Sequence, residues 1–356
     1  MKLRLTRNRQ TRSRAYSFIC CIYFVLSWQA AHAASAPTAI PATTLQVGYV
    51  PILPMAQLYV MEGEGWTRAA GLTLQKTAFA EGPGLVQALV EGKLDVAYFG
   101  IAPAMMAASK GVDLKVVASN IVEQVALIAR GDLRFFMLSD PISGLKKYAA
   151  KVKRKPRIAS FPPGSVPDAV FRHWLLEVAK LPLDTVEIVP MGAEQISKAL
   201  LAGEVDAASA LEPILTVVAA KDRTAKVVLD GAEMMPNQPG AVLAVRGELI
   251  RKNPQAVRKL VELHNRATEF LIRDPDRAAK HAFTAMSTAG QSQLTLALVE
   301  KAMTSPYSKF VADPYRIIES TKAMYDFQIK TGIMTKPVKL DQLFYTRFFD
   351  QATDRH

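Results

Sequence analysis

The sequence predicts an α/β fold of two similar lobes, each with a parallel-type sheet covered by helices on both faces. Three observations support this. Residues 88–97 are echoed by residues 199–208, with five of ten positions identical. The apolar runs 45–50 and 72–79 recur at the same offset of 111 residues. Strand-like and helix-like stretches alternate along both halves, at a spacing typical of parallel sheets.

The first lobe is expected over residues 45–130. Short apolar runs that end at Pro or Gly predict its strands, and longer runs with helical periodicity predict its helices. The expected strands are 45–50, 72–79, 95–99 and 114–118, and the expected helices are a stretch ending near Gly65, 85–91 and 104–110. Because the crossovers are helical, these strands should lie parallel.

The second lobe is expected over residues 131–240 and repeats this order. Its expected strands are 157–161, 186–189, 205–209 and 226–229, and its expected helices are 167–179, 193–201 and 213–220. A cluster of seven Lys and Arg residues between positions 146 and 157 could indicate a nucleic-acid patch. It has almost no interleaved aromatic residues, so we interpret it as a solvated linker and expect no nucleic-acid partner.

Two further segments with related sequences, 125–130 and 241–246, mark where the chain should leave the first lobe and return to it. Residues 241–356 are expected to form this return strand and four or five helices that pack on the first lobe. Pro254, Pro275 and later prolines separate these helices.

Residues 1–33 are typical of a secretory signal peptide. Six basic residues precede a short apolar core at 16–28 and the cleavage motif Ala31-His32-Ala33, so we expect cleavage after Ala33 and a periplasmic location. The alternative, an uncleaved anchor, is disfavoured because a spanning helix needs roughly 20 apolar residues. Residues 34–44 are expected to be a disordered lead-in.

Removal of this segment changes the chemistry of the chain. Both cysteines lie in it, so the remaining 356 − 33 = 323 residues can form neither a disulfide nor a thiolate metal site. The formal charge falls from +12 to +12 − 6 = +6. A lipid-anchored form is disfavoured, because the bulky Ile19 precedes Cys20. No metal and no cofactor are expected.

The turns that follow the strands favour ligand binding. Six prolines lie at five of these turns, where a first helical turn should start, which leaves neighbouring N–H groups free to point outward. Those groups and the positive helix end favour an anionic or acceptor ligand, and nearby glycines allow close approach. Apolar residues line the same edge. The prolines are Pro51, Pro54, Pro83, Pro103, Pro167 and Pro213. In open α/β sheets this edge is where ligands bind, so two facing lobes predict a cleft.

Several polar residues at these turns have two interpretations. Ser165 is either the N-cap of the next helix or a ligand contact. Glu81 and Glu212 either complement helix dipoles, which we favour, or contact a cationic group. Asp95 and Asp206, at helix-to-strand junctions, are favoured as turn-formers over ligands.

The chain resembles the solute-binding proteins of ATP-binding cassette importers, in the branch of sulfonate, taurine, nitrate, bicarbonate and thiamine-precursor binders. The resemblance covers about residues 45–280. It is carried by Val47-Gly48-Tyr49-Val50-Pro51, Phe79-Ala80-Glu81-Gly82-Pro83, Leu94 to Gly100 with Ala102-Pro103, Pro163-Gly164-Ser165, Gly203 to Ala207 and Glu212-Pro213. It implies a two-lobed periplasmic-binding fold of type II, in which segments 125–130 and 241–246 act as hinge strands and the protein docks on a membrane permease.

The resemblance also implies ligand contacts from the turns. The candidates are Leu53, Gly82, Ile101, Ala102, Asn120, Ser165 and Glu212. The implied ligand is a small organic solute, such as a sulfonate, a carboxylate or a similar nitrogen or sulfur nutrient; a pyrimidine or thiamine precursor is the alternative. Related binders often carry hydroxyl or basic groups in the first and third turns, where this chain has Ile52-Leu53-Pro54 and Ile101-Ala102. This difference disfavours a very small, highly polar ligand.

A catalytic role is the less favoured interpretation, since the superfamily includes a pyrimidine synthase. After residue 33 only four histidines remain, and the chain has no G-x-S-x-G, Walker or CxxC motif and no histidine pair at metal-ligand spacing. We therefore expect a monomeric binding protein rather than an enzyme.

Overall fold

The computed structural model describes residues 43–355. The expected signal peptide and its cleavage site lie outside the described residues, as does most of the expected lead-in. Strand β1 begins at Thr43, so the last two residues assigned to the lead-in belong to a strand instead.

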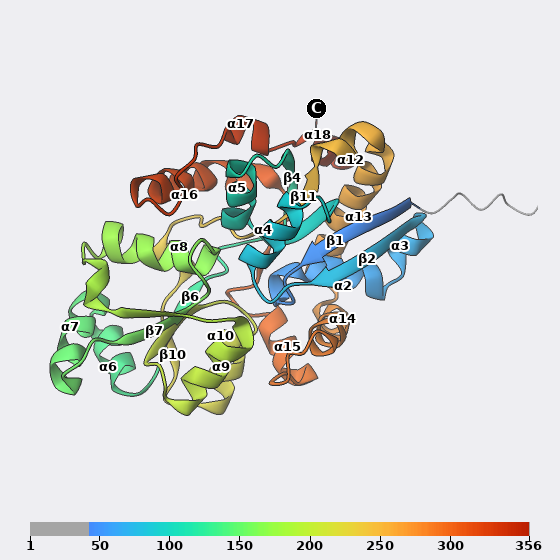
Figure 1. The fold of residues 1–356 in the computed structure, drawn as a ribbon. Coiled ribbons are helices and arrows are strands. Elements are labelled where there is room, and N and C mark those ends of the chain that lie inside the picture. The colour runs from blue at the N-terminus through green and yellow to red at the C-terminus, as the bar shows by residue number, and fades with distance from the viewer. Residues whose placement is uncertain (1–42, 356) are drawn as a thin grey trace, which may run out of the picture. The chain divides into compact units, whose positions relative to one another are not determined.

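The first sheet has the strand order β2-β1-β3-β11-β4 (Figure 1). Strand β1 pairs in parallel with β2 and β3, whereas β11 lies antiparallel between β3 and β4. The sheet is therefore mixed, not purely parallel. The strands are β1 (Thr43–Tyr49), β2 (Leu72–Ala78), β3 (Val96–Gly100), β4 (Leu114–Ser119) and β11 (Ala241–Arg246).

The second sheet repeats the first. Its order is β10-β6-β9-β7-β8, which read in reverse matches the first sheet strand for strand, with β6 in the antiparallel position that β11 occupies. This confirms the predicted doubled α/β architecture in two lobes. The strands are β6 (Ala126–Ala129), β7 (Arg157–Ser160), β8 (Glu187–Pro190), β9 (Ala207–Ala210) and β10 (Lys226–Leu229).

The placement of β6 differs from the expected division at residue 130. Segment 126–129 hydrogen-bonds to β9 and β10, so it belongs to the second sheet although its sequence follows the first lobe. Each lobe thus receives its antiparallel strand from the other half of the chain. Because β6 and β11 are held on both sides within sheets, neither is itself the connection between the lobes.

Those connections are the shorter segments 120–125 and 235–241, which run side by side. The Gln238 side chain ties them together: Val125 N–H donates to its Oε1 at 2.9 Å, and its Nε2 donates to Gly231 O at 3.1 Å. Gly240 permits the close approach, since a Cβ there would lie 2.4 Å from Ile121 O.

The helices of the lobes cover the sheet faces, as expected. In the first lobe they are η1 (Leu53–Met55), α2 (Ala56–Gly63), α3 (Trp66–Ala69), α4 (Gly82–Val90) and α5 (Ile101–Ser109). In the second they are α6 (Gly131–Ser139), α7 (Pro141–Val152), α8 (Val166–His173) continued by a π-helical turn (Trp174–Val178), η3 (Leu183–Thr185), α9 (Ala193–Ala202), α10 (Ile214–Lys221) and α11 (Gly231–Met234).

Helices α6 and α7 correct the interpretation of the basic cluster as a linker. Most of the cluster lies on α7 or just after it. Asp140 starts this helix by accepting hydrogen bonds from the N–H groups of Ile142 and Ser143, with Pro141 at the first helical position. Leu145 and Tyr148 are buried at i, i+3 spacing, so the helix has an apolar face beneath its lysines.

The C-terminal helices pack mainly on the first lobe, but not only there. Helices α13 and α14 pack on α2, and α17 and α18 pack on β4, whereas α15 contacts α10 and α16 contacts α8 of the second lobe. Among residues 43–355, no helix combines the length and the apolar character needed to cross a membrane. The elements are α12 (Gly247–Lys252), α13 (Pro254–Arg273), α14 (Pro275–Thr288), α15 (Leu296–Met303), η4 (Pro314–Ile317), α16 (Ile318–Lys330), α17 (Leu340–Leu343) and α18 (Arg347–Ala352), with the two-stranded β5 (Ile121–Val122) and β12 (Lys309–Phe310).

Asp95 and Asp206 stabilise equivalent junctions in the two lobes. Asp95 accepts a hydrogen bond from the N–H of Gln46 at 2.8 Å, and Asp206 accepts one from the N–H of Arg157 at 2.8 Å. In both lobes the carboxylate therefore joins one strand, β1 or β7, to the helix-to-strand turn beside it. This matches the structural role favoured from the sequence.

Candidate functional site

The carboxyl-terminal ends of strands from both sheets meet around one cavity. The volume that the centre of a water molecule can occupy in this cavity is about 40 Å³, which is enough for one or two waters. Its walls come from the turns after β1, β2 and β3 in the first lobe and after β7 and β9 in the second. The lining residues are Val50, Ile52, Met55, Glu81, Gly82, Gly100, Pro103, Gln124, Phe161, Ser165, Val166, Pro167, Leu211 and Ala241.

Three helices begin at this cavity. Glu81, Gly100 and Ser165 are the N-cap residues of α4, α5 and α8, and all three line it. The first N–H groups of a helix have no partner within the helix, and the helix end carries partial positive charge. The site can therefore bind a hydrogen-bond acceptor or a partial negative charge without a basic side chain.

A second pocket of about 210 Å³ adjoins the first through Val50 and Ile52. Its walls are the turns after β1 and β2, the start of α9 at Gly192–Gln195, and the turn after α14 at Ala289–Gln291. Both lobes and the C-terminal region therefore contribute to one continuous cleft, larger than the central cavity alone.

The predicted site residues divide into two groups. Gly82 and Ser165 line the central cavity. The other five do not line it and are at most 3 % exposed: Leu53, Ile101, Ala102, Asn120 and Glu212. The apolar members of this group form the packing beneath the turns, because their side chains point into the first lobe's core instead of the cleft.

Asn120 and Ser165 have structural partners. The Asn120 amide donates to Pro54 O at 3.0 Å, which fixes the turn after β1 to the crossing segment. The Ser165 hydroxyl accepts a hydrogen bond from the N–H of Asp168 at 3.3 Å, as expected for an N-cap. Ser165 still lines the cavity, so its hydroxyl proton can be donated to a ligand.

Glu212 is committed to the start of α10. Its carboxylate accepts hydrogen bonds from the N–H and the hydroxyl of Thr216, at 3.0 and 2.9 Å. Burial raises the pKa of Glu212, and the hydrogen bonds from Ser305 and Thr216 oppose that rise. This arrangement matches the dipole-complementing role favoured from the sequence.

Gln124 is a cleft residue that sequence reasoning missed. It lies in the crossing segment between the lobes, is 2 % exposed, and its Oε1 has no hydrogen-bond partner among residues 43–355. A buried amide oxygen without a partner is costly, so such a group is a candidate for ligand contact. Its position immediately before the apolar run 125–129 was the only sequence signal.

The charges at the cavity are sparse. None of its lining residues is Lys, Arg or His, and Glu81 is the only ionisable one. In the described part of the chain, no cluster of His, Cys, Asp and Glu could hold a metal ion. Recognition here would therefore depend on backbone N–H groups, the Ser165 hydroxyl and the Gln124 amide, set among apolar walls.

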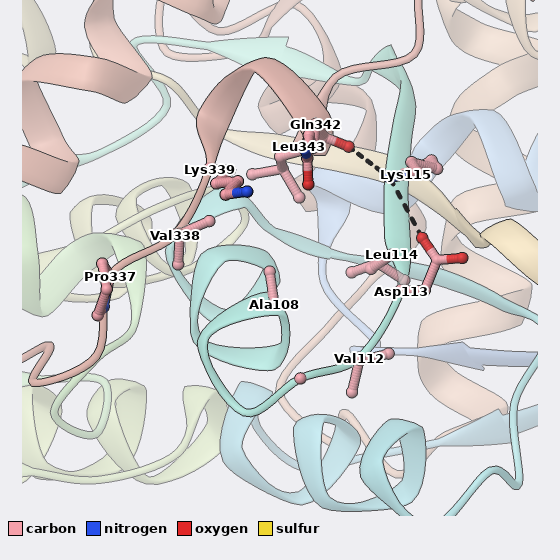
Figure 2. A pocket seen from close by; sticks show the side chains of 11 residues that line it. Ala108, Val112, Asp113, Leu114, Lys115, Pro337, Val338, Lys339, Gln342 and Leu343 are labelled. Atoms are coloured by element: carbon pink, nitrogen blue, oxygen red, sulfur yellow. Dashed lines mark hydrogen bonds and ion pairs between the residues drawn. The ribbon is translucent and has the colours of Figure 1, made fainter.

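A larger pocket of about 300 Å³ lies elsewhere, between the end of α5, the start of β4 and α17 (Figure 2). It is at the amino end of β4, opposite the sheet edge where α/β folds bind ligands. Lys115 and Asp113 in its wall are paired: Lys115 donates to Gln342 O at 2.6 Å and forms an ion pair with Asp113 at 3.2 Å. We therefore place the candidate site in the interlobe cleft.

The fold and the cleft together define a type II periplasmic-binding-protein fold, in which two α/β lobes enclose a site between their strand ends. Residues 38–286 match the NMT1-like family, and because this is more than half of the chain, the protein belongs to that family.

Individual proteins are also similar to this chain, one in sequence and two in fold. A protein of Brucella abortus (strain 2308), described as a binding protein with no ligand named, is 24% identical over 237 residues, which cover 66% of this chain and 69% of the relative. The periplasmic nitrate-binding protein NrtA from Synechocystis PCC 6803 is similar in structure, with a TM-score of 0.74, 14% identity and coverage of 88% and 89% of the two chains. The alkanesulfonate-binding protein SsuA from Xanthomonas axonopodis pv. citri, solved with MOPS, has a TM-score of 0.66 and 18% identity, and the match covers 85% of this chain and 98% of SsuA.

Proposed function

We propose that this protein is the periplasmic substrate-binding component of an ATP-binding cassette import system, and that it captures a small organic solute in the interlobe cleft. The observation that carries the proposal is the convergence of three helix N-termini, from both sheets, on one cavity with apolar walls. The likeness to nitrate- and sulfonate-binding proteins supports it. The expected periplasmic location, the permease partner and the monomeric state are part of this proposal.

Capture is proposed to occur by lobe closure. The lobes already touch at the cavity, because a Cβ added to Gly100 of the first lobe would lie 2.8 Å from Val166 Cγ2 of the second. The lobes are joined at this edge by the crossing segments 120–125 and 235–241. Bending within these segments would separate the two walls and admit a solute.

The ligand contacts proposed first are Gly82, Ser165 and Gln124, which line the cavity; the five buried candidates would support the turns that carry them. The lining favours a solute with one acceptor or weakly anionic head and an apolar body, such as a carboxylate or sulfonate with an organic group. Two observations favour the alternative, a neutral heterocycle such as a pyrimidine or thiamine precursor. No cationic side chain lines the cavity, and the Gln124 Oε1 has no partner within the described chain. A side-chain amide can pair with adjacent donor and acceptor atoms of such a ring.

A thermal-shift screen tests the proposal. The panel holds nitrate, sulfonates, carboxylates and pyrimidines. A ligand at a hundredfold excess over its Kd stabilises the folded protein by about 2.7 kcal/mol, which should raise the melting temperature by about 5 °C. A rise with a sulfonate or carboxylate supports the first ligand class, and a rise with a pyrimidine supports the alternative. If no compound produces a shift, the proposed ligand classes are wrong.

Gln124→Leu locates the binding site. Because Gln124 Oε1 has no partner within the described chain, the ligand-free variant should be at least as stable as the original protein. It should nevertheless lose most of the ligand-induced shift. Gln342→Leu, at the pocket in Figure 2, is the matched control and should keep the full shift. Loss of the shift in the control alone would place the site elsewhere.

A binding role also makes a negative prediction. Every compound that shifts the melting temperature should be recovered unchanged after long incubation with the protein. Consumption of the compound, measured by mass spectrometry and absent with Gln124→Leu, would identify the cleft as an active site and contradict the proposal.

A further inference from the structure

The segment 131–157 concentrates the charge of the protein. It contains eight Lys or Arg residues and two Asp residues, a net charge of 8 − 2 = +6. Residues 34–356 together also carry +12 − 6 = +6, because residues 1–33 hold six basic and no acidic residues. The rest of residues 34–356 is therefore net neutral. All of the net charge after residue 33 lies on α6, α7 and the start of β7.

The same segment exposes a group of large apolar side chains. Phe135 is 62% exposed, Leu138 56% and Ile142 40%. Of the eight large apolar side chains that are exposed among residues 43–355, these three fall within eight consecutive positions. Phe135 and Leu138 share one face of α6 at i, i+3 spacing, and Ile142 follows in the first turn of α7.

Basic groups surround these apolar side chains. The Arg134 guanidinium lies 4.1 Å from the centre of the Phe135 ring. On α7, Lys146 is exposed and follows Ile142 at i+4, on the same helical face. The exposed Lys153 is the C-cap residue, just after the end of this helix. Neither lysine forms an ion pair with another residue in the described part of the chain. We call this group of seven residues the α6–α7 corner: Arg134, Phe135, Leu138, Ile142, Lys146, Lys147 and Lys153.

The hairpin beneath this corner is a rigid platform. Helices α6 and α7 pack so closely that a Cβ on Gly144 would lie 2.7 Å from Phe136 O. Tyr148 of α7 donates a hydrogen bond to Asp206 at 2.5 Å, which anchors the helix to the second lobe. Figure 1 shows α6 and α7 together at the lower left, where α6 covers β6 and β10. The exposed residues are therefore not needed for the core and are free to face a partner.

We propose that the α6–α7 corner docks on the surface of an anionic lipid bilayer. Phe135, Leu138 and Ile142 enter the boundary between headgroups and acyl chains, and the lysines lie at the level of the phosphates. Aliphatic side chains at the tip favour a bilayer over a nucleic acid, whose binding rests on phosphate contacts and base stacking. Docking goes beyond solute capture: it would hold the protein at the membrane between binding events.

Vesicle cosedimentation tests this docking. The purified protein lacks residues 1–33 in every sample, so the basic residues there cannot contribute. Its binding is compared on phosphatidylcholine vesicles and on vesicles with about one-third phosphatidylglycerol, at low and high salt. We expect binding to the anionic vesicles at low salt, and a loss of about tenfold or more at high salt or on neutral vesicles.

Two variant pairs separate the contributions. Phe135→Ser with Leu138→Ser, and Lys146→Glu with Lys147→Glu, should each lower the partition coefficient on anionic vesicles by about tenfold. The controls carry the same chemistry elsewhere on the surface. They are Val178→Ser with Ile272→Ser, and Lys226→Glu with Lys336→Glu, and they should bind like the original protein.

Several outcomes would overturn the proposal. These are equal binding to neutral and anionic vesicles, unchanged binding of both α6–α7 variant pairs, or retention only on membranes that contain a protein partner. Melting temperatures are measured for all variants. If the Ser pair unfolds, the Lys pair, which changes only exposed side chains, still decides the result.

Discussion

His264 should make the stability of this protein depend on pH. It lies in α13, is fully buried, and its ring bridges Ser119 O, 2.7 Å from Nε2, and the Tyr98 hydroxyl, 3.4 Å from Nδ1. This geometry fits the neutral ring, with Nε2–H donating to the carbonyl and Nδ1 accepting from the hydroxyl. Burial lowers the pKa of His264 to about 4, against an ordinary value of 6.5, and the hydrogen bond to Ser119 opposes this only in part.

The sign of the effect follows from proton binding. Between pH 6.5 and pH 4 the unfolded chain binds a proton at His264 and the folded protein does not, so the free energy of unfolding falls as the pH falls through this window. With these pKa values the loss is about 2 kcal/mol at pH 5 and about 3 kcal/mol at pH 4, relative to pH 7.

Urea unfolding of the protein and of His264→Gln from pH 7 to pH 4.5 measures this loss. Glutamine keeps a donor for Ser119 O but cannot titrate. Carboxylates titrate in both proteins and cancel in the difference, so the free energy of unfolding should fall by about 2 kcal/mol less in the variant by pH 5. Parallel curves for the two proteins would refute the assignment of the pH dependence to His264.

Two further predictions concern the cleft and the lobe junctions. Gly100→Ala should weaken binding of a solute found in the screen by about tenfold, because the added Cβ would press on Val166 Cγ2. In calorimetric titration, adding Val166→Ala should restore the affinity. Unchanged affinity in the single variant would mean that the lobes need not meet there. In urea unfolding, Asp206→Asn should lower the free energy of unfolding by about 2 kcal/mol, and Asp95→Asn should lower it by less. The reason is that Asp206 also accepts hydrogen bonds from Arg154. Equal losses in the two variants would contradict this ranking.

Asp206 also links stability to acid pH. Burial raises its pKa, but hydrogen bonds from Arg154, from the N–H of Arg157 and from Tyr148 outweigh that effect, and the net pKa is lowered. Its contribution is therefore present near neutral pH and is lost as the pH falls through the lowered value.

The sequence predicted the doubled architecture because a repeat at constant offset is a property of the chain itself. Both sheets have the strand order that this repeat implies. The return of β11 to the first sheet was expected, but the repeat could not give the placement of β6 in the second sheet. Segment 126–129 has the same apolar character in either sheet, and only its register against β9 decides where it lies. The helix α7 was missed for a different reason: seven basic residues obscured the buried pair Leu145 and Tyr148.

The site was predicted as a set of turns more successfully than as a set of residues. Turns after the strands do line the cleft, because parallel strands bring their carboxyl ends to one edge. Which residue of a turn faces the cavity depends on the first helical turn, and a shift of one position changes the answer. Ile101 and Ala102 are buried, whereas Gly100 and Pro103 line the cavity.

The exchanged strands give the cleft a mechanical property that neither lobe has alone. Since β6 and β11 each lie inside a sheet, we expect motion between the lobes to bend segments 120–125 and 235–241, and Gln124 lies in the first of them. A solute that hydrogen-bonds the Gln124 amide would therefore contact the moving segment itself. Occupation of the cleft and the angle between the lobes would then be coupled through one side chain. For this reason Gln124→Leu should remove the hydrogen bond to the solute and also destabilise the closed arrangement of the lobes.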